Sequence, residues 1–130
     1  MNGKFLFDTN AIIDLLNRND LTLTEEQLDL IYSISIITEL ELLSSSNLDK
    51  SEEDAIIDIC SNSNIVNIDQ DIKNKTIKLR KKYKLKLPDA IICASAASLN
   101  IPLVSNDKIF ERVEEIKLIT LRTLRLKEKE

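Results

Sequence analysis

The sequence predicts an α/β fold, with one domain built on a central parallel sheet that carries helices on both faces. Short β-branched, apolar runs alternate along the chain with helical patterns, as parallel sheets require. The chain has 130 residues, 43% of them hydrophobic, which is enough for one core without disulfides. Its only glycine is Gly3, so no Gly/Ser-rich linker divides it.

The first half of the chain predicts two strands and four helices. A buried strand is expected at Lys4–Phe7, and Thr24 with Gln27 resembles a capping box that opens a short helix up to about Tyr32. Between them, four apolar residues at helical spacing indicate the first helix: Ala11, Ile12, Leu15 and Leu16.

Ser33–Ile37 reads as a β-branched strand that runs into a helix through Leu43. Ser51 with Asp54 predicts the start of the next helix, which ends near Cys60.

The second half begins with a strand at Ile65–Ile68, after which Asp69 opens a long amphipathic helix. Four residues of that helix are expected to face inward: Ile72, Ile77, Leu79 and Tyr83. Pro88 fits the first turn of the next helix, whose sequence AIICASAASL predicts heavy burial.

Two more strands are expected at Leu103–Ser105 and Ile116–Thr120, with a short helix in DKIFERV between them. Because strands alternate with helices, the strands should form a parallel sheet covered on both faces.

The chain contains no histidine, which excludes Ser-His and Cys-His nucleophiles, His-based RNA cleavage and His-ligated zinc. Cys60 and Cys93 have no paired spacing, so buried, reduced thiols are expected. Any hydrolysis must therefore use carboxylates, hydroxyls, Lys or Arg, most plausibly with a metal.

No apolar run approaches the roughly 20 residues that span a bilayer. The N-terminal MNGKFLFD reads as a strand rather than a signal peptide, so a cytoplasmic location and no membrane contact are expected.

The net charge of −4 conceals an uneven distribution. Residues 73–86 hold eight basic residues and no acids, while the rest of the chain carries ten basic and 22 acidic residues. A basic strip on an acidic body could bind phosphate, although a solvated helix face explains such a run equally well. The RNA-binding candidates are Lys78, Arg80, Lys81, Lys82 and Lys84.

Four acidic residues each end an apolar run: Asp8, Glu41, Asp89 and Asp107. In an α/β fold, strand ends and the adjoining helix starts are where sites form. Carboxylates gathered there repel each other, by roughly 4 kcal/mol for a pair about 4 Å apart at an effective dielectric near 20. Mg²⁺ or Mn²⁺ between them would offset this repulsion, so the sequence predicts a metal-dependent nuclease.

Each acid also has a structural explanation. Asp8 and Asp107 could cap helices, and Asp89 could face a helix dipole. Glu39 and Glu41 lie about 200° apart around a helix, so only one can face a shared pocket.

Four segments, FLFDTNAIIDLL, SIITELELLS, LPDAIICASA and LVSNDKIF, follow in this order from Phe5 to about Phe110. Together they resemble the acidic motifs of the PIN-domain nucleases, and most of all the VapC-type toxins of toxin–antitoxin pairs. The resemblance implies a PIN-like domain over residues 1–120 with strand order 3-2-1-4-5, followed by a charged tail at 121–130.

By motif, the family's metal-ligating acids fall on Asp8, Glu41, Asp89 and Asp107. Glu41 is preferred to Glu39 because the family motif runs from Ser through apolar residues to Glu-Leu. Thr9 and Ser105 match hydroxyl positions beside the site, although Thr is commoner than Ser at 105. Asn10 and Glu39 complete the auxiliary set.

The resemblance further implies Mg²⁺- or Mn²⁺-dependent hydrolysis of RNA phosphodiesters, leaving a 5′-phosphate and a 3′-hydroxyl. It also implies an antitoxin that places an Arg or another polar side chain among the acids, and a homodimer.

Three other functions compete with the nuclease. A haloacid-dehalogenase-type phosphatase needs Asp-x-Asp, but Asn10 stands at the second position. A receiver domain needs paired acids after its first strand and a late Lys, and both are missing. A non-catalytic module with the same fold and a degenerate metal site is the serious rival, and Mn²⁺ titration would separate it from the nuclease.

Overall fold

The computed structural model describes residues 5–17 and 32–121. The helix predicted after Thr24 and nearly all of the charged tail lie outside these ranges. Within them, no helix is long and apolar enough to cross a membrane.

Five parallel strands form one sheet in the order β3-β2-β1-β4-β5, which confirms the predicted fold and topology. The central strand β1 pairs with β2 and β4, so that Leu6 lies opposite Ser33 on one side and Leu103 on the other. The bounds are β1 Phe5–Phe7, β2 Tyr32–Ser35, β3 Asn64–Val66, β4 Leu103–Val104 and β5 Leu118–Ile119.

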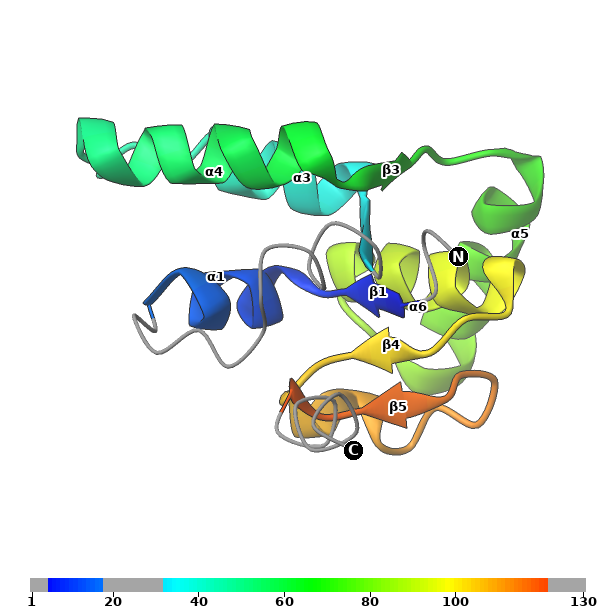
Figure 1. Ribbon diagram of the computed structural model, residues 1–130. Coiled ribbons are helices and arrows are strands. Elements are labelled where there is room, and N and C mark those ends of the chain that lie inside the picture. Colours follow the sequence, from blue (N-terminus) through cyan, green and yellow to red (C-terminus); the bar gives the residue numbers. More distant parts are fainter. Residues whose placement is uncertain (1–4, 18–31, 122–130) are drawn as a thin grey trace.

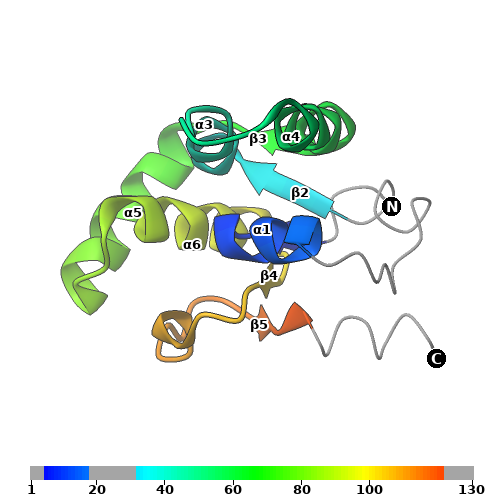
Figure 2. The same ribbon diagram turned by 90° about the vertical axis from the view of Figure 1, so that its left-hand side faces the viewer.

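Side chains alternate across the sheet and build one core on each face. Leu6 and Leu103 belong to the core under α5 (Gln70–Tyr83) and α6 (Leu87–Leu99). Phe7 and Val104 point to the opposite core. That second core is covered by α1 (Thr9–Asn17), α3 (Ile36–Leu43) and α4 (Lys50–Asn62), and Figures 1 and 2 show α3 and α4 lying together.

Several predicted boundaries differ from the structure. Strand β2 ends at Ser35 rather than Ile37, because Ser35 serves as the N-cap of α3 and accepts a hydrogen bond from the Ile37 N–H. Helix α4 begins two residues earlier than expected. Its capping box is Asp49 with Glu52, not Ser51 with Asp54, and the helix continues past Cys60 to Asn62.

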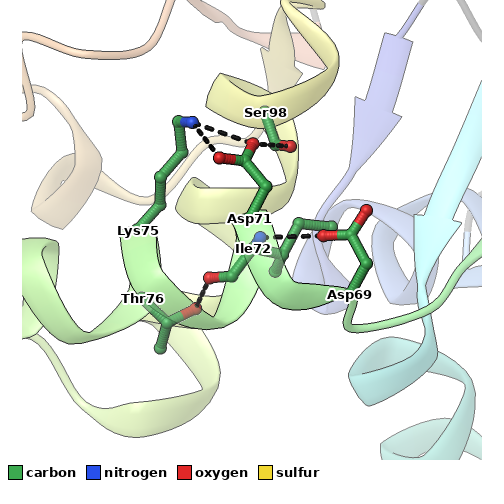
Figure 3. Close-up of polar contacts among 6 residues, drawn as sticks. All are labelled: Asp69, Asp71, Ile72, Lys75, Thr76 and Ser98. Carbon is green, nitrogen blue, oxygen red and sulfur yellow. Dashed lines mark hydrogen bonds and ion pairs between the residues drawn. The ribbon is translucent and has the colours of Figure 1, made fainter.

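Ile77 does not face inward as predicted. It is 47% exposed, whereas the stripe that α5 buries consists of Ile72, Thr76, Leu79 and Tyr83. Thr76 occupies the inward position because its hydroxyl donates to the Ile72 carbonyl at 2.7 Å, which satisfies the hydroxyl inside the core (Figure 3). Apolar periodicity alone favoured the isoleucine over the threonine.

The helix predicted in DKIFERV is only one 3₁₀ turn, Lys108–Phe110. The buried side chain of Phe110 anchors this turn in the core. The three other strands predicted after Leu43 are each shorter than expected, by one to three residues. Three further local predictions are confirmed. Asp69 caps α5, Pro88 lies in the first turn of α6, and both cysteines are free and buried.

Candidate functional site

The candidate site forms where the carboxyl ends of β1 and β4 lie side by side. Asp8 directly follows β1, and Ser105 directly follows β4 and leads to Asp107. Asp89 lies in the first turn of α6, and Glu41 lies in the second half of α3. The topology therefore directs all four predicted acids to this region.

Asp8 is the buried centre of the arrangement, with only 3% of its surface exposed. The Ala11 N–H donates to Oδ1 at 2.7 Å, so Asp8 caps the start of α1 as the structural explanation expects. The Ser105 hydroxyl donates to Oδ2 at 2.5 Å, and the Asp107 N–H donates to Ser105 Oγ at 3.0 Å. These bonds fix the Asp8 carboxylate and tie it to the segment that carries Asp107.

The four acids interact electrostatically. Burial raises the pKa of Asp8, and the charges of Asp107 and Asp89 raise it further, against the lowering effect of the hydrogen bonds from Ser105 and Ala11. The pKa of Asp89 is also raised, first by burial, then by the charge of Asp107 and to a smaller extent by that of Glu41. Both shifts show that negative charge is concentrated here.

Glu41, rather than Glu39, is oriented toward this cluster. The Thr9 hydroxyl donates to Glu41 Oε1 at 2.6 Å, and a hydrogen bond of 3.1 Å joins the hydroxyls of Thr9 and Thr38. Glu39 points elsewhere, since its charge acts on the Cys60 thiol, whose pKa is raised first by burial and then by Glu39. The two side chains thus point to different sides of α3, as expected from the angle of about 200° between them.

The other two auxiliary residues, Ser105 and Asn10, differ in burial. Ser105 is fully buried between Asp8 and Asp107, whereas Asn10 is exposed in the first turn of α1. The sequence interpretation missed Thr38 and Lys86. Thr38 stands one helical turn before Glu41, a spacing that places both on one face. Lys86 is the N-cap of α6, and its positive charge opposes the rise in the pKa of Asp89.

The donor chemistry suits a hard divalent cation, because all four acids offer carboxylate oxygens and two of them have pKa values raised first by burial and then by their neighbours' charges. In the described ranges, however, no three acidic or thiol side chains are grouped so that they could hold an ion as they stand. Glu41 and Asp107 are turned to local donors, Thr9 and the Ile109 N–H at 3.0 Å.

A groove of about 580 Å³ adjoins the site between α1, α3 and α4. Thr9 and Glu41 line it, so the groove is continuous with the acid cluster. Its other walls are largely apolar and come from Ile13, Leu16, Leu42, Leu48, Ala55 and Ile56.

The predicted basic strip lies on α5 and the turn into α6, on the other side of the sheet from this groove. Lys82 Nζ forms an ion pair with Glu115 Oε2 at 3.0 Å. The Tyr83 hydroxyl donates a hydrogen bond to Oε1 of the same glutamate at 2.6 Å. Arg80, Lys81 and Lys84 instead line a separate pocket at the C-terminal end of α5.

Comparison with known proteins gives a consistent result. The sequence profile of the PIN domain family matches residues 5–116. A chain of a toxin-antitoxin complex from Klebsiella pneumoniae is 33% identical, with a TM-score of 0.70 over 88% of this chain and 95% of that one. No curated protein sequence matches.

Two further solved structures share the fold at lower identity. A DNA-bound VapBC from Salmonella typhimurium has a TM-score of 0.79 at 22% identity and covers 91% of this chain and 98% of its own. VapBC-1 from nontypeable Haemophilus influenzae has a TM-score of 0.70 at 24% identity, with 89% and 96% covered.

Proposed function

Because the chain belongs to the PIN domain family, we propose that it is a metal-dependent endoribonuclease and the toxin of a type II toxin–antitoxin pair. The observation that carries the proposal is the buried Asp8, whose pKa is raised by burial and by the charges of Asp107 and Asp89. The complex from Klebsiella pneumoniae, at 33% identity, supports the toxin–antitoxin assignment.

We assign the metal ligands to Asp8, Asp89, Asp107 and Glu41, and Mg²⁺ or Mn²⁺ as the metal. Such a cation, when bound, lowers the pKa of a water molecule and neutralises charge on the scissile phosphate. The chain's own contribution is to hold the carboxylates. Ser105 fixes Oδ2 of Asp8, and Thr9 holds Glu41 beside the start of α1.

Concentrated negative charge would repel an RNA phosphate unless positive groups compensate for it. Lys86 supplies one such group at the start of α6, where its charge already acts on Asp89. The N-terminal N–H groups of α6 add positive potential at the same place. The charge of Lys86 and the N–H groups of α6 would therefore help a phosphodiester to approach the acids. We propose a cytoplasmic location for this nuclease.

The groove beside Glu41 provides a site for the antitoxin. We propose that an amphipathic antitoxin helix packs its apolar face against Ile13, Leu42 and Ile56, as helices do in hydrophobic grooves. The groove opens at Glu41, so an Arg at the end of that helix would form a charge-assisted bond there and block the acids. We also propose a homodimer, since Leu40 and Leu43 on α3 are 55% and 46% exposed.

Cleavage of a labelled structured RNA tests the function. Purified, antitoxin-free protein is compared with its Asp8→Asn variant, with and without Mn²⁺. Metal-dependent cleavage that the variant loses is the expected result. Cleavage that the variant retains would show that Asp8 is not part of the site.

The rival function is a binding module with a degenerate metal site. The arrangement of the acids, which hold no ready three-ligand group in the described ranges, is the observation in its favour. Mn²⁺ titration by calorimetry separates the two, because saturable binding that Asp8→Asn and Asp89→Asn abolish is expected only of the nuclease. Absence of saturable binding would favour the module.

A further inference from the structure

The basic stretch 73–86 is not a uniform surface. Lys75 is held by both oxygens of Asp71, at 2.7 and 2.8 Å, and Asp71 also accepts a hydrogen bond from Ser98 on α6 (Figure 3). Lys82 is paired with Glu115. The first of these pairs lies within α5, and the second joins α5 to the segment before β5, so both lysines already have acidic partners.

Three of the other six cations, Arg80, Lys81 and Lys84, line a pocket of about 500 Å³ at the corner between α5 and α6. Among the residues that the structure describes, no acidic residue lines this pocket. The Arg80 Nε donates to the Leu85 carbonyl at 3.3 Å, which holds the guanidinium near the pocket and leaves its terminal N–H groups available.

Apolar side chains complete the same pocket. Ile77 is 47% exposed and Leu87 is 49% exposed, and both line it. Two large apolar side chains beside three cations give the pocket a lining that is both apolar and basic. A matching ligand is therefore anionic and also presents an apolar surface, as a nucleotide does with its phosphate and its base.

The pocket adjoins the candidate active site along the chain. Leu87 is the first residue of α6, and Asp89 follows two residues later in the same helical turn. Lys86, between Lys84 and Leu87, already acts electrostatically on Asp89. Leu87 and Asp89 lie about 200° apart around α6, so a single strand that contacts both the acid cluster and the pocket would bend around the start of this helix, past Lys86.

We propose that the pocket at the α5–α6 corner binds one nucleotide of a single-stranded RNA substrate, outside the cleavage site. Its cations contact the backbone phosphates while Ile77 and Leu87 contact the base. This inference rests on the proposed function for the identity of the ligand. It restricts the substrate class to RNA with an unpaired segment beside the cleaved bond.

Lys84 offers an unusually clean test. It is the C-cap residue of α5 and has a left-handed backbone, with φ 57° and ψ 39°, a conformation that glycine adopts more readily. Lys84→Gly should therefore remove a charge without lowering the melting temperature. Asn100, the C-cap of α6 with φ 55° and ψ 46°, supplies the matched control Asn100→Gly.

Binding is measured by fluorescence anisotropy with a labelled single-stranded RNA of about 12 nucleotides, a typical site length for single-strand binding. All variants carry Asp8→Asn and are measured in EDTA, so that neither metal nor cleavage contributes. Lys84→Gly and Lys81→Glu should each raise the Kd about fivefold or more and reduce the salt slope by about 0.7 per lost phosphate contact. Asn100→Gly and Lys50→Glu, on the opposite face of the sheet, should leave the Kd unchanged.

Unchanged affinity in both pocket variants would overturn the proposal, even if the wild-type protein cleaves RNA. Equal competition by a poly-glutamate peptide, or by fully paired RNA of the same length, would also overturn it, because an acidic protein segment or a duplex would then fit as well. If the pocket variants lose affinity but the wild-type protein cleaves no RNA, the pocket stands and the nuclease proposal fails.

Discussion

Replacing Asp8 with asparagine or alanine separates the role of its charge from the role of its hydrogen bonds. Both variants remove the carboxylate charge, so both should lose cleavage. Only asparagine keeps an oxygen to accept from the Ala11 N–H and an amide group to donate to Ser105 Oγ. The difference in stability between the two variants therefore isolates these two bonds.

The magnitude follows from the contacts. Loss of the helix cap costs about 1 kcal/mol, and loss of the buried bond to Ser105 costs about 1 kcal/mol more. Asp8→Ala should then be about 2 kcal/mol less stable than Asp8→Asn, measured by urea unfolding at pH 7 in EDTA. Equal stability of the two variants would refute the view that Asp8 has a structural role in addition to its charge.

The pH dependence of the wild-type protein has a defined sign. Burial and nearby acids raise the pKa of Asp8 above the ordinary 3.8. Between these two values the folded state binds more protons than the unfolded state, so stability falls as the pH rises through the raised pKa. The Asp8→Asn variant has no carboxyl group at this position and does not lose this stability. Its free energy of unfolding, relative to that of the wild type, should therefore rise between pH 3.8 and the raised pKa and stay constant at higher pH.

Urea unfolding at a series of pH values from 3.8 upward measures this difference. A wild-type protein that gains stability relative to Asp8→Asn as the pH rises would refute the electrostatic reasoning. Mn²⁺ should reverse the order, because ligand that binds only the folded wild-type protein adds about 2.7 kcal/mol at 100 times its Kd.

Three further outcomes are expected. Glu41→Gln should lower the initial rate of RNA cleavage at least about 100-fold, while Glu39→Gln, which faces Cys60, should stay within about threefold. Asp49→Ala should lower the free energy of unfolding by about 1 kcal/mol through loss of the capping box, and urea unfolding of Asp49→Asn should show little change. Leu79→Ala should cost about 2–5 kcal/mol by the same measurement, against less than about 1 for the exposed Ile77→Ala.

The sequence predicted the sheet, its flanking helices and the strand ends that carry the acids, because short parallel strands here are buried on both faces and read as apolar runs. The topology 3-2-1-4-5 came from the family resemblance, since pattern alone does not order the strands. Boundaries were less accurate. Ser35 and Asp49 act as caps through side-chain bonds that the apolar pattern does not contain.

The errors on α5 have a related cause. Periodicity counts hydrophobic residues, so it chose Ile77 over Thr76, although a hydroxyl bonded to the preceding turn can be buried. The same bias concealed the pocket at the α5–α6 corner. Exposed Ile77 and Leu87 among lysines can be recognised only when the helix rotation and the corner geometry are known.

Asp89 distinguishes the structural explanation of the acids from the functional one. An aspartate that merely stabilised the start of α6 would be favoured in its charged form by the helix dipole, and its pKa would fall. Instead its pKa is raised, by burial and by Asp107, and it accepts no hydrogen bond from any residue in the described part of the chain. The charged form of Asp89 is therefore less favourable in the folded protein than in water. A half-buried carboxylate with a raised pKa, beside a second one at Asp8, is not what helix stability alone requires, and it supports the cation site that we propose.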